Sequence, residues 1–566
     1  MAMPQDASLG TPKLAERPWL LHWPKGVPTH IDYPDATISQ LLDQMASSRP
    51  KGVQFVFYGR EVTFAETSLQ SKRVASGLAK MGVKKGDRVG LMMPNCPQFA
   101  FVFFGINKLG AVIVPINPLY TPREVKAVLA DSEAKVIFTL DMFYQAARGG
   151  VEGTAVEKIV VSRISDYMPP VVALLGRMLR KVPSGEVSRS EKNMTLKEVM
   201  DNDGAGPEVT VNPVDDPAVF MYTGGTTGEP KAAVLTNRNI VSNAVMIQRW
   251  CDMSPDDVVL DALPWFHVYG LSVGLDNTVT AGCKAIVLPK FSTEDVFKAI
   301  KKYKPTYYPG VFSMYIALLS SPHLEKYKES LKSIRYCVSG AAPLPVEVAK
   351  AWSAATGGII VEGYGLSEAS PVTHVNPMDD PSHMKYGSIG VPIMDTDAKV
   401  MDMETGKKQM AVGEIGELAI SGPQVGKGYW SREAETRNTF RDGWLYTGDI
   451  AYMDEDGYFF IVDRKKDMIN VGGLKVWPRE VEEVAYQNPA VKLAAAIGVS
   501  DSFYGEVPKL YVVLKDEYKG KVTGNDIREF VKDKLTKHKI PREVEIRDEL
   551  PTTLVGKIVR RKLREQ

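Results

Sequence analysis

The chain has 566 residues, of which 44% are hydrophobic and 24% charged, so it is a globular sequence too long for a single hydrophobic core. Its 69 basic and 68 acidic residues nearly cancel, which argues against a nucleic-acid partner. Its four cysteines lie far apart in the sequence, which argues against a structural zinc site and is typical of a reducing compartment.

The N-terminal third of the chain alternates between strand and helix patterns. The opening MAMPQDASLG lacks the basic start and apolar run of a signal peptide, so we expect a cytoplasmic protein. A helix is predicted at about residues 38–47, and Thr63 and Glu66 have the spacing of a capping box. The runs VQFVFY, RVGLMMP, AVIVPI and KVIFTL indicate strands, with helical periodicity between them. This alternation predicts an α/β fold with parallel sheets covered on both faces.

Residues 168–182, MPPVVALLGRMLRKV, interrupt this alternation. Five apolar residues fall on one helical face: Val171, Leu174, Leu175, Met178 and Leu179. Arg177, Arg180 and Lys181 lie beside them, and a basic amphipathic helix can lie on an anionic membrane. Such a stripe more often packs on its own domain. The membrane interpretation predicts peripheral contact at the inner face of the membrane.

The segment 222–233, YTGGTTGEPKAA, joins two apolar runs through residues of almost no bulk. Glycines allow successive backbone N–H groups to converge on a phosphate, while the threonines add hydroxyl donors and the lysine a cation. A Gly-rich hairpin turn alone would not require the threonines and the lysine, and Pro230 rules out the Gly-Lys-Ser/Thr of a Walker A loop. The predicted phosphate loop therefore consists of Thr223, Gly224, Gly225, Thr226, Thr227, Gly228 and Lys231.

The C-terminal half predicts two smaller units. Short alternating runs separated by Gly and Asp turns over about residues 386–460 indicate a small β-barrel or sheet. The charged connector DRKKD follows at 463–467, and the last ~100 residues alternate again as a small domain. We therefore predict a large N-terminal domain at 1–462, a hinge at 463–467 and a small α+β C-terminal domain at 468–566.

The motif YTGGTTGEPK resembles the phosphate-binding loop of the acyl-adenylate-forming superfamily, which contains acyl-CoA synthetases, amino-acid adenylation modules and luciferases. Ala232 departs from the glycine usual in that pattern. The resemblance extends from about residue 30 to the end of the chain, through LPWFHVYG, SGAAPLP, EGYGLSEAS, the TGD and DRKKD block, and LPTTLVGKIVRRKLRE. Each of these motifs alone is equally compatible with an ordinary structural role, such as a helix cap or a small-residue turn. Their order makes the resemblance specific.

The resemblance implies a site for ATP and AMP. Tyr364 would stack on the adenine, Ser367 would contact the α-phosphate, and Asp449 and Arg464 would bind the ribose hydroxyls. Besides the phosphate loop, the implied nucleotide site comprises Gly340, Ala341, Ala342, Glu362, Gly363, Tyr364, Gly365, Ser367, Asp449, Arg464 and Lys557.

The resemblance also implies four catalytic residues: Lys557, Glu368, His267 and Lys231. Lys557 would reach both the attacking carboxylate and the α-phosphate. Glu368, together with Thr226, would hold Mg²⁺, a hard cation that binds oxygen ligands and phosphates. His267 would line the acyl site, although a single histidine at an aromatic-rich strand end is equally a structural residue.

The C-terminal domain would contribute a second set of residues. By resemblance, Gly472 and Gly473 lie where the pantetheine arm of coenzyme A approaches, because glycine permits close passage of a thin ligand. Lys466 would be the pivot of the hinge. The two half-reactions need different groups at one carbonyl, so a rotation about 463–467 is expected.

The motifs are most similar to those of bacterial long-chain fatty-acid:CoA ligases, particularly the connector DRKKDMI. The resemblance implies that a fatty acid reacts with ATP to give acyl-AMP and pyrophosphate, and that the acyl group then passes to coenzyme A. A medium-chain or aryl acid is the alternative substrate. A non-catalytic acyl or nucleotide binder is disfavoured by the intact Lys557, Glu368 and Lys231. A homodimer is a further expectation.

Overall fold

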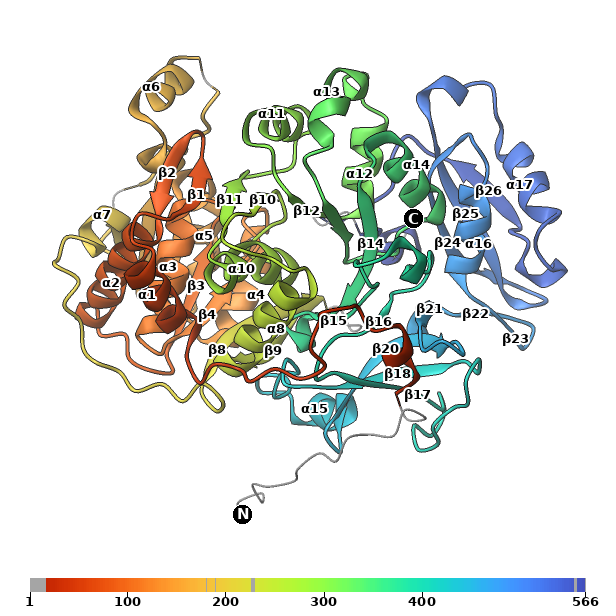
Figure 1. The fold of residues 1–566 in the computed structure, drawn as a ribbon, viewed down its shortest axis with the longest axis horizontal. Coiled ribbons are helices and arrows are strands. Elements are labelled where there is room, and N and C mark those ends of the chain that lie inside the picture. Colours follow the sequence, from red (N-terminus) through yellow and green to blue (C-terminus); the bar gives the residue numbers. More distant parts are fainter. Residues whose placement is uncertain (1–16, 180, 189, 225–229, 554–556, 565–566) are drawn as a thin grey trace.

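The computed structural model describes residues 17–179, 181–188, 190–224, 230–553 and 557–564 (Figure 1). The described residues form four sheets, two of them large and flanked by helices, and two small. In Figure 1 the two large sheets lie side by side, and the C-terminal sheet stands at the opposite end from the N-terminal helices. Within these residues, no helix is long and apolar enough to cross a bilayer.

The first large sheet has the order β7-β6-β5-β3-β4-β8-β9 and is parallel except for the antiparallel hairpin of β8 and β9. The hairpin pairs Thr223 with Lys231 and Gly224 with Pro230, so the predicted phosphate loop leaves from its tip. The strands are β3 (Arg88–Met92), β4 (Val112–Pro115), β5 (Val136–Leu140), β6 (Lys158–Ser162), β7 (Asn193–Thr195), β8 (Pro217–Gly224) and β9 (Pro230–Thr236).

The second large sheet has the order β16-β15-β14-β13-β12-β10-β11-β1-β2. It is parallel from β1 to β14, whereas β2, β15 and β16 pair antiparallel with their neighbours. Strands β2 and β15 return through short connections, and a longer segment joins β15 to β16. The prediction of parallel sheets therefore holds for the central strands, and both large sheets are mixed at their edges. The strands are β1 (Val53–Phe57), β2 (Arg60–Thr63), β10 (Val258–Asp261), β11 (Lys284–Val287), β12 (Tyr307–Gly310), β13 (Tyr336–Ser339), β14 (Ile359–Gly365), β15 (Val372–Val375) and β16 (Val391–Pro392).

Local signals set the starts of the helices that cover these sheets. The side chains of Thr63 and Thr121 accept the N–H groups of Glu66 and Glu124, which caps two first turns. The helices are α1 (Ile38–Ser48), α2 (Phe64–Lys80), α3 (Pro97–Lys108), α4 (Pro122–Ser132), α5 (Tyr144–Val151), α6 (Pro170–Met178), α7 (Leu196–Val199), α8 (Asn237–Trp250), α9 (Val268–Gly270), α10 (Asn277–Ala281), α11 (Thr293–Tyr303), α12 (Phe312–Leu319), α13 (Leu324–Leu331) and α14 (Val346–Thr356).

Helices α3 and α6 differ in how their apolar residues are used. Helix α3 is buried on every face between α2 and the sheets. Helix α6 projects from the edge of the molecule (Figure 1). Its stripe is exposed: 68% at Val171, 61% at Leu174 and 72% at Met178. The expectation that this stripe packs on its own domain is therefore wrong.

The predicted barrel region contains a five-stranded antiparallel sheet. Its last strand runs into the predicted hinge, where a 3-10 turn at Lys465–Asp467 follows it. Its elements are β17 (Asp397–Met401), β18 (Gly416–Ser421), α15 (Glu433–Thr439), β19 (Phe440–Arg441), β20 (Trp444–Met453) and β21 (Phe459–Arg464).

The C-terminal region is a small α+β unit with a hydrophobic core of its own, to which Ile469, Val481 and Leu510 contribute. Its sheet has the order β23-β22-β25-β24, with β26 paired to β25. Its elements are β22 (Ile469–Val471), β23 (Leu474–Val476), α16 (Pro478–Tyr486), β24 (Val491–Asp501), β25 (Gly505–Leu514), α17 (Gly524–Lys532), β26 (Glu543–Ile546) and α18 (Arg560–Arg564).

Candidate active site

A cavity of about 1720 Å³ lies where β8, β13 and β14 end, and the antiparallel sheet and the C-terminal segment complete its walls. Carboxyl ends of parallel strands are the usual ligand edge of an α/β sheet. The site residues predicted from the sequence that line it are Thr223, Lys231, His267, Gly340, Ala341, Ala342, Glu362, Gly363, Tyr364, Gly365, Ser367, Glu368, Asp449, Arg464, Lys466 and Lys557. Gly224 ends β8, and Gly225, Thr226, Thr227 and Gly228 lie outside the described residues.

Tyr364, Asp449 and Arg464 form one connected polar group on the wall of the cavity. The Tyr364 hydroxyl donates to Asp449 Oδ2 at 2.6 Å, and Arg464 Nε lies 3.3 Å from Asp449 Oδ1. The pairing of β20 with β21 places Asp449 opposite Arg464. Asp449 raises the pKa of the Arg464 guanidinium against the effect of burial. The aromatic ring and the carboxylate implied for adenine and ribose are thus held together by a direct bond.

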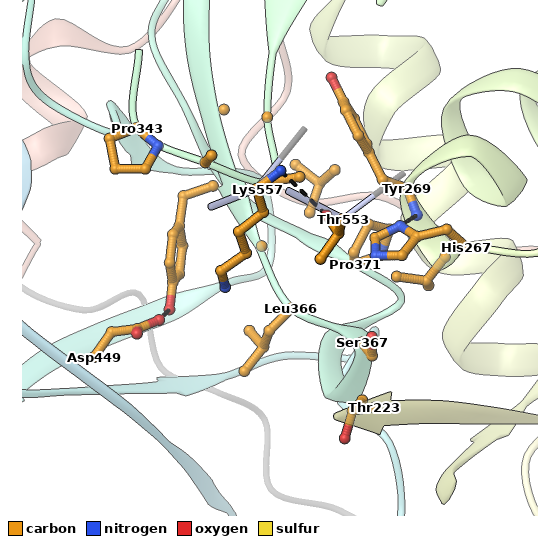
Figure 2. Close-up of a pocket in the computed structure, with 18 of the residues that line it drawn as sticks. Thr223, His267, Tyr269, Pro343, Leu366, Ser367, Pro371, Asp449, Thr553 and Lys557 are labelled. Carbon is orange, nitrogen blue, oxygen red and sulfur yellow. Dashed lines mark hydrogen bonds between the residues drawn. The ribbon is translucent and has the colours of Figure 1, made fainter. Parts of the chain in front are cut away.

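Lys557 enters the cavity from the C-terminal segment of the chain. Its N–H donates to Thr553 Oγ1 at 3.1 Å, its carbonyl accepts the Thr553 N–H at 2.8 Å, and its side chain extends between Asp449 and His267 (Figure 2). Burial and the nearby charge of Arg464 lower the pKa of Lys557 to about 7, and Asp449 offsets only part of this shift. The ammonium is therefore held where an anionic ligand would stabilise it.

His267 is a neutral hydrogen-bonding group at pH 7. Burial and the charge of Lys557 lower its pKa to about 4. Its Nδ1 accepts the Tyr269 N–H at 3.3 Å at the start of α9 (Figure 2). Because Nδ1 accepts, Nε2 carries the proton and can donate to an oxygen in the cavity.

Tyr429 is a site residue that the sequence analysis missed. Its hydroxyl donates to Glu368 Oε1 at 2.7 Å, and the centroid of its ring lies 5.5 Å from Lys231 Nζ. Lys231 Nζ is also 3.9 Å from Glu435 Oε1. The tyrosine thus links the two charged residues expected to act on phosphates. The only sequence signal is an aromatic residue after the glycines of VGKGYW.

A second part of the cavity is apolar. Trp250 donates its ring N–H to the Asn376 carbonyl at 3.3 Å, so its polar atom is satisfied away from the cavity. The apolar residues that line this part come from α8 and the turn after it, β10, the segment after His267, β15 and the residues on either side of β16: Ile247, Trp250, Met253, Val259, Val273, Val372, Val375, Ile389 and Ile393. One cavity therefore joins a charged half to a hydrocarbon-like half.

Gly472 and Gly473 do not line this cavity. They form the exposed turn between β22 and β23 with φ values of +59° and +91°, which glycine adopts without strain. The Gly472 N–H donates to the Tyr504 carbonyl at 2.8 Å. The structure therefore brings Lys557, and not the glycine pair, to the site.

Comparisons with known proteins match nearly the whole chain. A family described as AMP-binding enzyme matches residues 42–430, and the AMP-binding enzyme C-terminal domain matches residues 480–557. The long-chain-fatty-acid–CoA ligase of Bacillus subtilis is 40% identical over 560 residues, covering 98% of each chain. That of Salmonella typhimurium is 37% identical over 566 residues, covering 97% of this chain and 98% of its own.

A solved structure gives the same result for the fold. The crystal structure of ATP-bound MatB from Rhodopseudomonas palustris superposes with a TM-score of 0.80 at 29% sequence identity. The match covers 94% of this chain and 99% of that chain.

Proposed function

The chain belongs to the AMP-binding enzyme family as an acyl-CoA ligase of the AMP-forming kind, and from this premise we propose that its acid substrate is a long-chain fatty acid. The observation that carries the proposal is a single cavity in which Lys557, His267 and the Tyr364–Asp449 pair border an apolar branch. Such a cavity can hold a nucleotide and a hydrocarbon chain with their reactive ends together.

In the first half-reaction a carboxylate oxygen attacks the α-phosphorus of ATP, and the bond to pyrophosphate breaks. Both reactants are anionic, so their approach requires a cation and directed donors. Lys557 supplies the cation, because binding of two anions raises its lowered pKa and keeps the ammonium protonated. His267 Nε2–H donates to the carboxylate and orients it without adding charge.

Mg²⁺ fits the phosphate side of the cavity. Glu368 offers a carboxylate whose Oε1 is fixed by Tyr429, while Thr226 lies outside the described residues. Within the described residues no group of three or more His, Cys, Asp and Glu side chains is arranged to hold a metal. A sparse set of protein ligands suits Mg²⁺, which takes its other ligands from phosphates and water. The ion would neutralise phosphate charge.

In the second half-reaction the thiol of coenzyme A attacks the acyl carbonyl, and AMP leaves. We propose that the C-terminal domain at 468–566 turns about the connector 463–467, with Lys466 as pivot, and brings Gly472 and Gly473 to the cavity. Their exposed position on a turn of the same domain supports this proposal. Hinges of this kind need only one or two residues that absorb a dihedral change.

The chain length of the acid can be tested by measuring acyl-CoA formation with saturated acids of increasing length and with aryl acids. We expect kcat/KM to rise with chain length, because each buried CH₂ contributes about 0.8 kcal/mol of binding. Val273→Phe should lower kcat/KM for long acids more than for short ones, because Val273 lines the apolar branch. Val245→Phe is the matched control: Val245 is equally 8% exposed but does not line the cavity. A preference for aryl or medium-chain acids would contradict the proposal.

We further propose that α6 contacts a lipid surface at the inner face of the membrane. Its apolar stripe is exposed, and Arg177 and Lys181 lie beside it to attract anionic headgroups. A stable protein interface takes about 20–30 residues a side, far more than this short helix offers. A lipid surface is therefore a better partner for the exposed stripe than a second copy of the chain. Fatty acids also partition into bilayers, where such a contact places the enzyme.

Sedimentation with vesicles of phosphatidylglycerol and phosphatidylcholine tests this contact. Leu174→Gln combined with Met178→Gln should reduce binding severalfold, and added salt should weaken binding of the parent. Leu21→Gln is the control, because Leu21 is 62% exposed against 61% for Leu174 but lies outside the stripe. Equal binding by all three proteins would contradict the proposal, and a change in oligomeric state only would favour a dimer contact.

A further inference from the structure

Arg560 is the centre of a buried charged cluster, three residues after Lys557 in the sequence. Its Nη2 lies 2.8 and 2.9 Å from the two carboxylate oxygens of Glu482, a bidentate pair within the C-terminal unit. Its Nη1 lies 3.1 Å from Asp463 Oδ1 and 3.4 Å from Asp467 Oδ2. One guanidinium therefore joins helix α16 of the C-terminal unit to both ends of the connector.

Asp463 receives two separate contacts from the C-terminal unit. It belongs to strand β21 of the antiparallel sheet and its side chain is only 3% exposed. Besides Arg560, its Oδ2 accepts the backbone N–H of Arg479 at 2.8 Å, in the first turn of α16. The N-cap residue of that helix, Trp477, provides no side-chain cap, so Asp463 supplies the missing acceptor from another sheet.

The segment that carries Lys557 packs as part of the C-terminal unit. Leu563 is buried against Ile497 and Tyr511 of β24 and β25, and Ile558 packs on the same cluster. Lys557 directly precedes Ile558, which forms an antiparallel bridge with Thr552. A contact that holds the C-terminal unit against Asp463 therefore also holds Lys557 in the cavity.

We propose that Asp463 is a positioning residue, a latch that favours the arrangement with Lys557 in the cavity and so favours acyl-AMP formation. This inference rests on the proposed turning of the C-terminal domain about Lys466. The Arg560–Glu482 pair lies on one side of that pivot and persists in both arrangements. The contacts of Asp463 with Arg560 and with the Arg479 N–H cross the pivot and break when the domain turns.

Asp467 provides a matched control. It is buried like Asp463 and contacts the same Arg560, but it lies beyond Lys466 and moves with the C-terminal unit. Asp463→Asn and Asp467→Asn therefore remove the same charge from the same cluster, and only the first weakens a contact that crosses the pivot.

The test measures the two half-reactions separately: pyrophosphate release from acid and ATP, and thioester formation from preformed acyl-AMP and coenzyme A. Asp463→Asn should slow pyrophosphate release roughly tenfold, because it weakens charge-assisted hydrogen bonds that hold Lys557 in the cavity, and should leave thioester formation unchanged or faster. Asp467→Asn should leave the ratio of the two rates as in the parent. A merely structural role would lower both rates together.

Two outcomes would overturn the latch: an unchanged ratio of rates in Asp463→Asn, or the same change of ratio in both variants. Thermal unfolding of each variant separates loss of folding from loss of positioning. Failure of the proposed function is distinguishable, because the parent enzyme would then form no acyl-CoA from any fatty acid.

Discussion

Lys557 and Arg560 lie three residues apart in the same C-terminal segment, yet their surroundings shift their pKa values in opposite directions. Burial and neighbouring cations lower the pKa of Lys557 to about 7. Burial acts on Arg560 too, but Glu482 and Asp463 outweigh it and hold its pKa above the ordinary value. The charge of Arg560 is neutralised by protein carboxylates, whereas the ammonium of Lys557 remains available to pair with an anionic substrate. Arg560 is therefore a structural cation, whereas Lys557 has the environment expected of the catalytic cation that we propose.

The largest expected effect is on adenylation by Lys557→Ala. Loss of a preorganised charge at the transition state should lower the rate of pyrophosphate release by about 10²–10³ or more. Thioester formation from preformed acyl-AMP should change little, since that step has no phosphoryl transition state. Rapid-quench measurement of each half-reaction checks this. An equal loss in both would remove Lys557 from the catalytic role.

Arg560→Met should give the largest loss of stability. It leaves Glu482 and Asp463 buried without their partner, and breaking a buried pair costs about 3–5 kcal/mol. Chemical unfolding followed by tryptophan fluorescence measures the difference from the parent protein. A loss below about 1 kcal/mol would mean that the cluster contributes little and would weaken the contrast with Lys557.

The protonation of Lys557 gives a pH test. With a pKa of about 7 in the free enzyme, a fraction of the molecules lack this proton at pH 7–8 and must take it up when ATP binds. Apparent ATP affinity should therefore fall as the pH rises above 7. Calorimetry in buffers of different ionisation enthalpy should detect uptake of about half a proton near pH 7. Lys557→Met should abolish this uptake, and persistence of it would assign the proton to another group.

The smallest expected effect is a gain of stability in Lys557→Met. The folded-state pKa is lower than the unfolded value of 10.5, so burial of the charged form costs stability in full below about pH 7, and this cost is relieved as the pH rises towards 10.5. The variant should be more stable by about 1 kcal/mol at pH 6, with the gain lost near pH 10. Denaturant unfolding at both pH values checks the sign, which is opposite to that of Arg560→Met.

The sequence by itself determined the order of the motifs, and most of the site residues predicted from it line the cavity. Strand and helix periodicity predicted the alternating sheets, and a threonine three residues before a glutamate correctly placed the start of α2. Tyr364, Ser367 and Glu368 were found because they lie in one short segment. Such signals are local: a few adjacent residues specify the turn or the cap.

The tertiary structure alone decided which distant residues share a charge environment. The Tyr364–Asp449 bond joins positions 85 residues apart, and Arg560 meets Asp463 across 97 residues. Tyr429 carries no recognisable local pattern, and the DRKKD motif marks Asp463 as part of the connector without revealing its contacts, because the partners of both residues are supplied by other parts of the fold. The exposure of the α6 stripe was likewise misjudged from periodicity, which shows that a face is apolar but not what covers it. Burial and long-range contact arise only when the sheets pack, and they set the opposite electrostatics of Lys557 and Arg560.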